Sequence, residues 1–400
     1  MLTKPPASSS QANPGFPASK DLVLAGSGEQ EPCFSPGLHG TSPPPPRSRP
    51  ITRILLLIAS LLLTLCVLEL AVRLLARLTS EDRVMTPDAV LGWKLLPNAL
   101  TFHRRDSQPY HIVINTKGLR DRERPYDKPP GTFRIVVIGD SVVFGSGGVE
   151  MPQRFTELLE QATQHVEVIN MGVPGYGTDQ ELLYLQTEGL KYHPDLVLFC
   201  VFFNDFNESF EPINAWNGRP KGYFSLQDDD LVFHPPSFST FYLLSQHSYL
   251  LGLADMGLMK VSQAYRKRYH RQGMVLDPPT RIKVFQRMFA SVAELCRQNG
   301  IRVMFVYLPY PAQKGPLPMQ KLMESAAAEH QVPVLDLTDT LAAAHDVKPA
   351  YFPGDVHFNE YGHRVVAGAL YHGLAGSGGL EPRLLKQKIE DSNAAIGSPQ

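Results

Sequence analysis

The sequence predicts an α/β protein in which a parallel sheet of about five strands is covered by helices on both faces, preceded by one membrane-spanning helix. Short, continuously apolar segments alternate with segments of helical period over residues 131–375, which is typical of a parallel sheet buried on both sides. Polar residues follow several of these segments, as expected at the carboxyl edge of such a sheet. One long apolar stretch precedes them.

Length and composition limit the class of protein. The 400 residues suit an α/β domain of roughly 250 residues with appendages. The 38 basic and 39 acidic residues nearly cancel, so composition gives no case for a nucleic-acid partner. Cys33, Cys66, Cys200 and Cys296 form no metal-binding or disulfide pattern, and we expect Cys200 and Cys296 to be buried small apolar residues.

The N-terminal region has two parts. Residues 1–50 hold 11 of the 35 prolines and much Ser and Gly, which indicates a disordered segment. Residues 51–78 then form an apolar stretch in which only Ser60 and Thr64 are polar between Ile54 and Leu68. At about 1.5 Å per residue, this stretch is long enough to cross a bilayer as a helix.

Three interpretations of residues 51–78 compete. A cleaved signal peptide fits less well because the leader is long and no clean small-residue cleavage site precedes Arg73. A buried core helix fits less well because the segment is apolar on every side. A single-pass anchor with the N-terminus in the cytoplasm fits best, which places the rest of the chain outside the cytoplasm, and in the periplasm if the source is a bacterium. Arginines flank both ends, so charge leaves this orientation open.

The elements of the main domain follow in order after a polar collar over 79–130, in which we expect one or two short strands. The helix predicted at 179–193 would have Thr178 or Asp179 as its N-cap residue. Strands are predicted at 132–139, 166–172, 195–203, 301–308 and 332–337, with helices at 152–165, 179–193, 281–300 and within 351–370. Residues 376–400 are expected to form a flexible tail.

An insert at 206–280 interrupts this alternation and is too long for a plain crossover. We expect a hairpin turned at 228–230, then mostly helix over 238–268. The basic run at 266–268 and Arg271 indicates a solvated helix face, or else a contact with anionic lipid or polysaccharide. Because the insert leaves from a strand end that bears site residues, it is expected to cover the site.

Residues suited to catalysis follow four of the predicted strands. They are Gly139-Asp140-Ser141, the glycines Gly172, Gly175 and Gly177, the pair Asn204-Asp205, and Asp355-Val356-His357. The tripeptide at Ser141 is common by itself, but the convergence of all four groups at one sheet edge is far more specific.

This combination predicts nucleophilic catalysis. A serine hydroxyl needs a base, and a neutral imidazole serves near pH 7, so we assign Ser141 as nucleophile and His357 as general base. Asp355 lies two residues from His357 and, in extended backbone, would point the same way and orient the ring. The N–H groups of Ser141 and Gly175 and the side-chain amide of Asn204 would form the oxyanion hole. No metal or cofactor is predicted.

Structural roles are the alternatives for these residues. Ser141 would then only cap a helix, and His357 would be a loop histidine. Asp140 is expected to shape the turn, and Asp205 and Asn207 to cap a loop. His363 is expected at the surface or in packing. Tyr176, Tyr307 and Tyr310 would line a substrate cleft or be half buried.

The motifs resemble those of the SGNH (GDSL-type) hydrolase superfamily over roughly 130–375. Block I matches Gly139-Asp140-Ser141, block II matches Gly175 with Gly172 as a competing alignment, block III matches Asn204, and block V matches His357. The resemblance implies a three-layer, flavodoxin-like fold and acyl transfer from esters without a metal or cofactor.

The sequence departs from the family pattern at two places, and these departures add alternatives to the predicted function. Phe202-Phe203 precede Asn204 where the family usually has G-x, which makes that wall of the pocket bulkier. The family's D-x-x-H is D-x-H here, so a Ser141–His357 dyad oriented by a backbone carbonyl is an alternative to Asp355. The spacing also resembles polysaccharide O-acetyltransferases. We therefore expect a serine esterase for short acyl esters, with an O-acyltransferase to a cell-envelope polysaccharide or a non-catalytic module binding a glycan or partner as alternatives.

Overall fold

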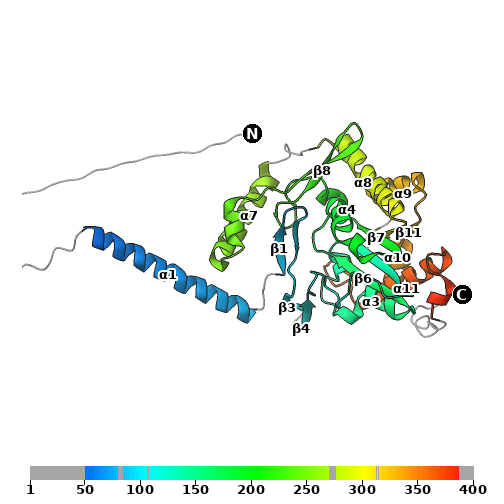
Figure 1. The fold of residues 1–400 in the computed structure, drawn as a ribbon, viewed down its shortest axis with the longest axis horizontal. Coiled ribbons are helices and arrows are strands. Elements are labelled where there is room, and N and C mark those ends of the chain that lie inside the picture. The colour runs from blue at the N-terminus through cyan, green and yellow to red at the C-terminus, as the bar shows by residue number, and fades with distance from the viewer. Residues whose placement is uncertain are drawn as a thin grey trace, which may run out of the picture. The chain divides into compact units, whose positions relative to one another are not determined.

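The computed structural model describes residues 50–79, 84–105, 108–269, 276–311, 313 and 315–386 (Figure 1). The disordered segment predicted for residues 1–50 lies outside these ranges apart from Pro50, as do residues 387–400 of the predicted tail.

A five-stranded parallel sheet forms the centre of the molecule, as predicted. Its order is β11-β10-β7-β5-β6, and β5 pairs with β6 in a register that sets Gly139 opposite Gly172. The carboxyl ends of these neighbouring strands therefore lie side by side. The strands are β5 (Phe133–Gly139), β6 (Val166–Gly172), β7 (Leu196–Phe202), β10 (Arg302–Leu308) and β11 (Val334–Asp336).

Helices cover both faces of the sheet and enclose two apolar cores. Alternate residues of one strand enter opposite cores: Val136 and Ile138 face α4 and α8, whereas Ile135 and Val137 face α3 and α11. This burial on both faces explains why the strands are continuously apolar. The helices are α3 (Phe155–Gln161), α4 (Thr178–Thr187), α8 (Pro278–Gln298), α9 (Pro318–Glu329), α10 (Thr338–Val347) and α11 (Glu360–Gly376).

Two helix boundaries differ from the prediction. The helix expected at 152–165 is a 3-10 turn, η1 (Met151–Gln153), followed by α3. The predicted cap of α4 is wrong: Gly177 is the N-cap residue, and Thr178 and Asp179 lie inside the helix. Asp179 is buried in an ion pair with Lys221 from the insert, a tertiary contact that local propensity does not register. Residues after α4 form η2 (Gly189–Tyr192), and η3 (Pro382–Leu384) follows α11.

The predicted collar holds four strands rather than one or two, and it packs against the main core. Trp93 is fully buried, and the Tyr176 hydroxyl donates to its carbonyl at 2.6 Å. The term polar collar is therefore wrong for this segment. Its strands are β1 (Met85–Asp88), β2 (Gly92–Leu95), β3 (Leu100–Arg105) and β4 (Gln108–Val113).

The insert has the predicted hairpin and helices. Asp228 and Asp229 form the hairpin turn with positive φ values of 51° and 67°, a conformation that Asp tolerates better than most residues. The basic run falls where the structure describes no side chains, and Arg271 lies outside the described residues. The elements are α5 (Asp205–Glu208), β8 (Tyr223–Gln227), β9 (Asp230–His234), α6 (Thr240–Ser245) and α7 (Tyr249–Tyr269).

The predicted anchor is a single helix, α1 (Pro50–Thr79). Over Pro50–Ala76 it is long and apolar enough to cross a membrane, and none of its most apolar window is buried in the protein. Length and composition alone support this assignment.

Candidate active site

The nucleophile turn follows the end of β5. A short helix, α2 (Ser141–Phe144), begins directly after Asp140, whose Oδ1 accepts the Val142 N–H at 2.8 Å. Asp140 is thus the N-cap residue, as its predicted turn-shaping role requires, and Ser141 is the first residue of the helix. The alternative in which Ser141 is only a helix cap is wrong.

A row of hydrogen bonds joins Ser141, His357 and Asp355. His357 Nε2 lies 2.9 Å from Ser141 Oγ, and His357 Nδ1 lies 2.7 Å from Asp355 Oδ1. The fold therefore brings together two segments more than 200 residues apart. The His357 and Asp355 side chains remain 20% and 23% exposed, so the row is accessible from solvent.

Asp355 reaches His357 for a different reason from the one predicted. The backbone here is a turn and not an extended strand: Asp355 Oδ1 also accepts the N–H groups of Val356 at 2.6 Å and of His357 at 3.2 Å. A carboxylate that caps its own turn holds the following ring in place. The D-x-H spacing is therefore compatible with an orienting carboxylate.

The two glycines that compete for block II have different surroundings. The Gly172 N–H donates to Asn170 Oδ1 at 3.0 Å, so it is already used. Gly175 has a positive φ of 81°, and within the described part of the chain neither its N–H nor that of Ser141 has an acceptor. These two donors are available to a developing oxyanion.

Asn204 lies beside the nucleophile turn, where its amide hydrogen bonds to the Asp140 carboxyl. Burial raises the pKa of Asp140, although the Val142 N–H, His357 and Asn204 oppose that rise. Asn204 is also the N-cap residue of α5, and its Oδ1 has no partner among the residues described. The structure thus brings all five predicted site residues to one edge of the sheet.

The insert reaches this edge through a tight turn. Asn214 is buried, and its Nδ2 donates to the Gly175 carbonyl at 2.8 Å. A Cβ added at Gly175 would lie 2.9 Å from the Trp216 ring, which is 63% exposed. On the other side, a Cβ at Gly147 would lie 2.9 Å from the Cβ of His357. These close approaches leave little room between the loops that border the site.

Several other predicted roles change. Tyr176 and Tyr307 are fully buried in the core and line no cleft. Tyr310 packs on Phe203 at 5.3 Å between ring centroids, at the wall that the two phenylalanines make bulkier. Of the two roles predicted for His363, packing is the one observed: it is fully buried, its Nδ1 accepts the Phe155 N–H at 3.2 Å, and burial lowers its pKa to about 3.

Buried carboxyl groups behind the nucleophile turn were not predicted. Glu181 on α4 is fully buried, and neither of its side-chain oxygens has a partner among the described residues. Burial and the nearby Asp205 raise its pKa well above the ordinary value. Within the same part of the chain, no three His, Cys, Asp or Glu side chains form a group that could hold a metal ion.

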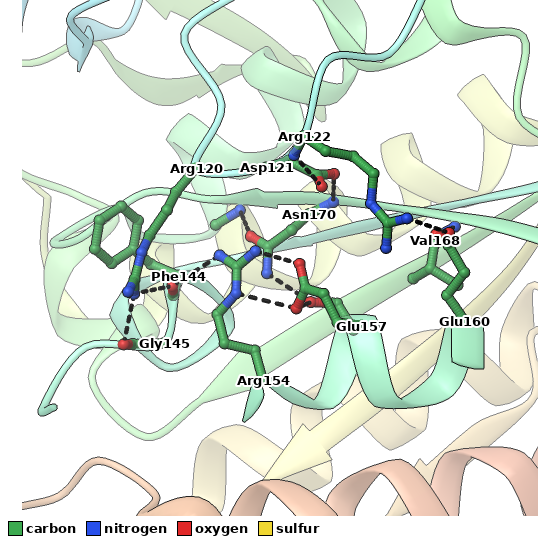
Figure 2. A network of polar contacts seen from close by, with 12 residues as sticks. Arg120, Asp121, Arg122, Phe144, Gly145, Arg154, Glu157, Glu160, Val168 and Asn170 are labelled. Atoms are coloured by element: carbon green, nitrogen blue, oxygen red, sulfur yellow. Dashed lines mark hydrogen bonds and ion pairs between the residues drawn. The ribbon is translucent and has the colours of Figure 1, made fainter. Parts of the chain in front are cut away.

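Arginines that support the nucleophile helix were also missed (Figure 2). Figure 2 shows Arg120 and Arg154 pointing at the carbonyl end of α2, with Asn170 and Glu157 beside them. Arg120 lies in the segment predicted to be a polar collar, and no sequence motif around it indicates a contact with the active site.

A helix-covered parallel sheet with a Ser–His–Asp row at its carboxyl edge is the arrangement of an α/β protein suited to nucleophilic acyl transfer. The family model of GDSL-like lipases and acylhydrolases matches residues 137–365, more than half of the chain. The chain belongs to this family, and the protein is a hydrolase of ester bonds.

The chain is also similar, at low sequence identity, to several solved structures. A lipase/acylhydrolase from Enterococcus faecalis is 17% identical, covering 64% of this chain and 99% of its own, with a TM-score of 0.37. A member of the lipolytic G-D-S-L family from Veillonella parvula is 16% identical, covering 61% and 99%, with a TM-score of 0.36. A two-domain esterase active on acetylated mannans is 12% identical, covering 64% and 52%, with a TM-score of 0.37. No curated protein matches the chain significantly.

Proposed function

We propose that the protein is a serine esterase that hydrolyses short-chain carboxylic esters through an acyl-enzyme. The observation that carries this proposal is the row in which Ser141 Oγ lies 2.9 Å from His357 Nε2 and His357 Nδ1 lies 2.7 Å from Asp355 Oδ1. Both distances are within the range that proton transfer and ring orientation require.

The geometry supports a two-step reaction. Ser141 Oγ attacks the ester carbonyl as His357 Nε2 takes its proton, and the Asp355 carboxylate stabilises the resulting imidazolium. The free N–H groups of Ser141 and Gly175 stabilise the oxyanion, and the Asn204 amide joins them by turning from Asp140. His357 then protonates the leaving alcohol, and water releases the acid from the acyl-enzyme by the reverse sequence.

We also propose that α1 anchors the protein in a membrane with the N-terminus in the cytoplasm and the enzyme outside it. The apolar span over Pro50–Ala76 supports the anchor. Three arginines lie at its beginning, and Arg73 and Arg77 lie at its end, so charge alone does not set the orientation and the sidedness experiment tests it. In sealed vesicles of known sidedness, added protease should then digest the catalytic part only where the outer side of the membrane is exposed.

The test of the reaction uses the full chain in detergent with p-nitrophenyl esters. Ser141→Ala should lower kcat by about 10³-fold or more, because it removes the nucleophile. Ser146→Ala, five residues along and outside the row, is the matched control and should retain kcat within about twofold. A fluorophosphonate should label Ser141, and mass spectrometry of the labelled peptide identifies the site.

The alternatives give different results in the same assay. Acyl transfer to an added polysaccharide at the expense of free acid would indicate an O-acyltransferase. A wild-type protein that neither hydrolyses esters nor reacts with the fluorophosphonate would contradict the esterase and favour a binding module. A series of acyl chain lengths then defines the substrate class.

A further inference from the structure

The helix that carries the nucleophile, α2, is too short for its own hydrogen bonds to fix its orientation. α2 has four residues, and its carbonyl end closes at Gly145 with a positive φ of 79°. A helix of one turn leaves its last carbonyl groups without partners in the helix. Side chains from elsewhere must therefore satisfy these carbonyls and fix the angle at which Ser141 faces His357. Asn170 Nδ2 donates to the Val143 carbonyl at 2.7 Å.

Arg120 supplies two further contacts. Its Nη1 donates to the carbonyls of Phe144 at 3.0 Å and Gly145 at 2.8 Å. Its Nη2 donates to Val149 at 2.8 Å, on the loop after α2, and to His111 at 2.9 Å, on β4. One planar side chain thus joins α2, the following loop and a strand of the collar, which a lysine could not do.

All the hydrogen bonds described for Arg120 are to carbonyl oxygens, and its guanidinium lies 5.0 Å from the centroid of the Phe144 ring and 6.0 Å from that of Tyr110. The side chain is 1% exposed, and among the described residues it forms no ion pair. The neighbouring Arg154 does pair, with Glu157, and its Nη1 donates to the Phe144 carbonyl at 3.2 Å. Burial and the charge of Arg154 lower the pKa of Arg120 to about 9. A buried cation is costly, and here it lies at the negative end of the helix dipole.

We propose that Arg120 is a positioning residue of the esterase, which holds the nucleophile helix so that Ser141 Oγ stays within hydrogen-bonding distance of His357 Nε2. This inference rests on the proposed function. Arg120 lies upstream of residues 137–365, the part that matches the family, so the collar completes the site from outside the matched region. A displacement of α2 by about 1 Å would be enough to lower the rate about 100-fold.

The experiment compares Arg120→Lys with Arg134→Lys in the full-length protein. Arg134 is also fully buried and also donates to two backbone carbonyls, those of Tyr126 at 2.8 Å and Tyr192 at 2.7 Å, but it lies at the start of β5, away from α2. Both variants lose a planar side chain in the core, so both should lower the unfolding temperature.

Only Arg120→Lys should lower kcat, by about 10- to 100-fold, with KM within about threefold of wild type. Fluorophosphonate labelling of Ser141, counted per folded molecule, should slow by a similar factor. If Arg120→Lys does not fold, Arg120→Gln, which keeps a neutral donor, gives the same comparison.

Equal kcat values for Arg120→Lys and Arg134→Lys would overturn the inference, as would a loss of activity that only follows the unfolded fraction. These outcomes differ from failure of the proposed function. An active Ser141→Ala variant would overturn the esterase mechanism itself, whereas a fully active Arg120→Lys beside an inactive Ser141→Ala would overturn only the role of Arg120.

Discussion

At the scale of single residues, Asp355 has the most direct prediction. Its carboxylate lies 2.7 Å from His357 Nδ1 and would stabilise the imidazolium that forms during attack. Asp355→Asn keeps the shape but removes the charge and favours the wrong tautomer of the ring. We expect kcat to fall by about 10²- to 10⁴-fold, measured with p-nitrophenyl acetate. An unchanged kcat would instead favour a Ser141–His357 dyad.

Glu181 gives a prediction about stability. Its folded-state pKa is raised by burial, whereas in the unfolded chain it loses its proton above about pH 4.3. As the pH rises past that value, only the unfolded state releases the proton. The free energy of unfolding therefore falls, by up to about 1.4 kcal/mol per pH unit until the folded pKa is reached.

Glu181→Gln replaces the carboxyl group with an amide of similar shape that does not titrate, and so removes this loss. We expect the variant to melt at a higher temperature than wild type at pH 8 and at nearly the same temperature at pH 4.5, by scanning calorimetry. Glu329→Gln, at an exposed position of α9, serves as the control and should show no such pH-dependent difference. A difference that is the same at both pH values would contradict a raised pKa.

At the scale of elements, the packing of α2 on the end of β6 depends on Gly172. A Cβ added there would lie 2.1 Å from the Phe144 nitrogen and 2.6 Å from the Val143 carbonyl carbon, so the helix would have to move. We expect Gly172→Ala to destabilise the protein by about 2–3 kcal/mol and to lower kcat, since α2 carries Ser141.

Gly368→Ala is the matched control for this substitution. Gly368 lies inside α11, and a Cβ there meets nothing within 4 Å. Because alanine has a higher helix propensity than glycine, the control should stabilise the protein by about 0.5–1 kcal/mol without changing kcat. Urea unfolding and ester hydrolysis measure the two effects. A stable, fully active Gly172→Ala would show that α2 tolerates displacement.

At the scale of the whole molecule, the prediction concerns the membrane. Leu61 and Leu63 are exposed in the middle of α1. Replacing both with Arg should weaken insertion by about 2.5–3.5 kcal/mol per charge, whereas replacing both with Phe should not. We expect carbonate-washed membranes to retain the Phe variant and to release much of the Arg variant. Equal retention would argue against a spanning helix.

Much of the fold could be predicted because the signal is local. Each strand of the sheet is buried on both faces, so Ile135 to Ile138 are all apolar whatever packs on them. Ser141 likewise directly follows the end of β5, at the carboxyl edge of the sheet, whereas His357, contrary to the prediction, lies beyond α10 and does not follow a strand. The predicted N-cap of α4 was wrong because Asp179 pairs with Lys221, a residue 42 positions away in the sequence.

The sequence by itself determined the α/β class, the succession of strands, the apolar N-terminal helix and the pairing of a serine with a histidine. Only the tertiary structure decided which glycine has a free N–H, that Tyr176 is core and not cleft, and that Arg120 supports the nucleophile helix. The physical reason is the distance along the sequence between the residues that interact. Strand burial and helix period are set by neighbouring residues, whereas a hydrogen bond to a backbone carbonyl depends on which distant segment the finished fold brings beside it.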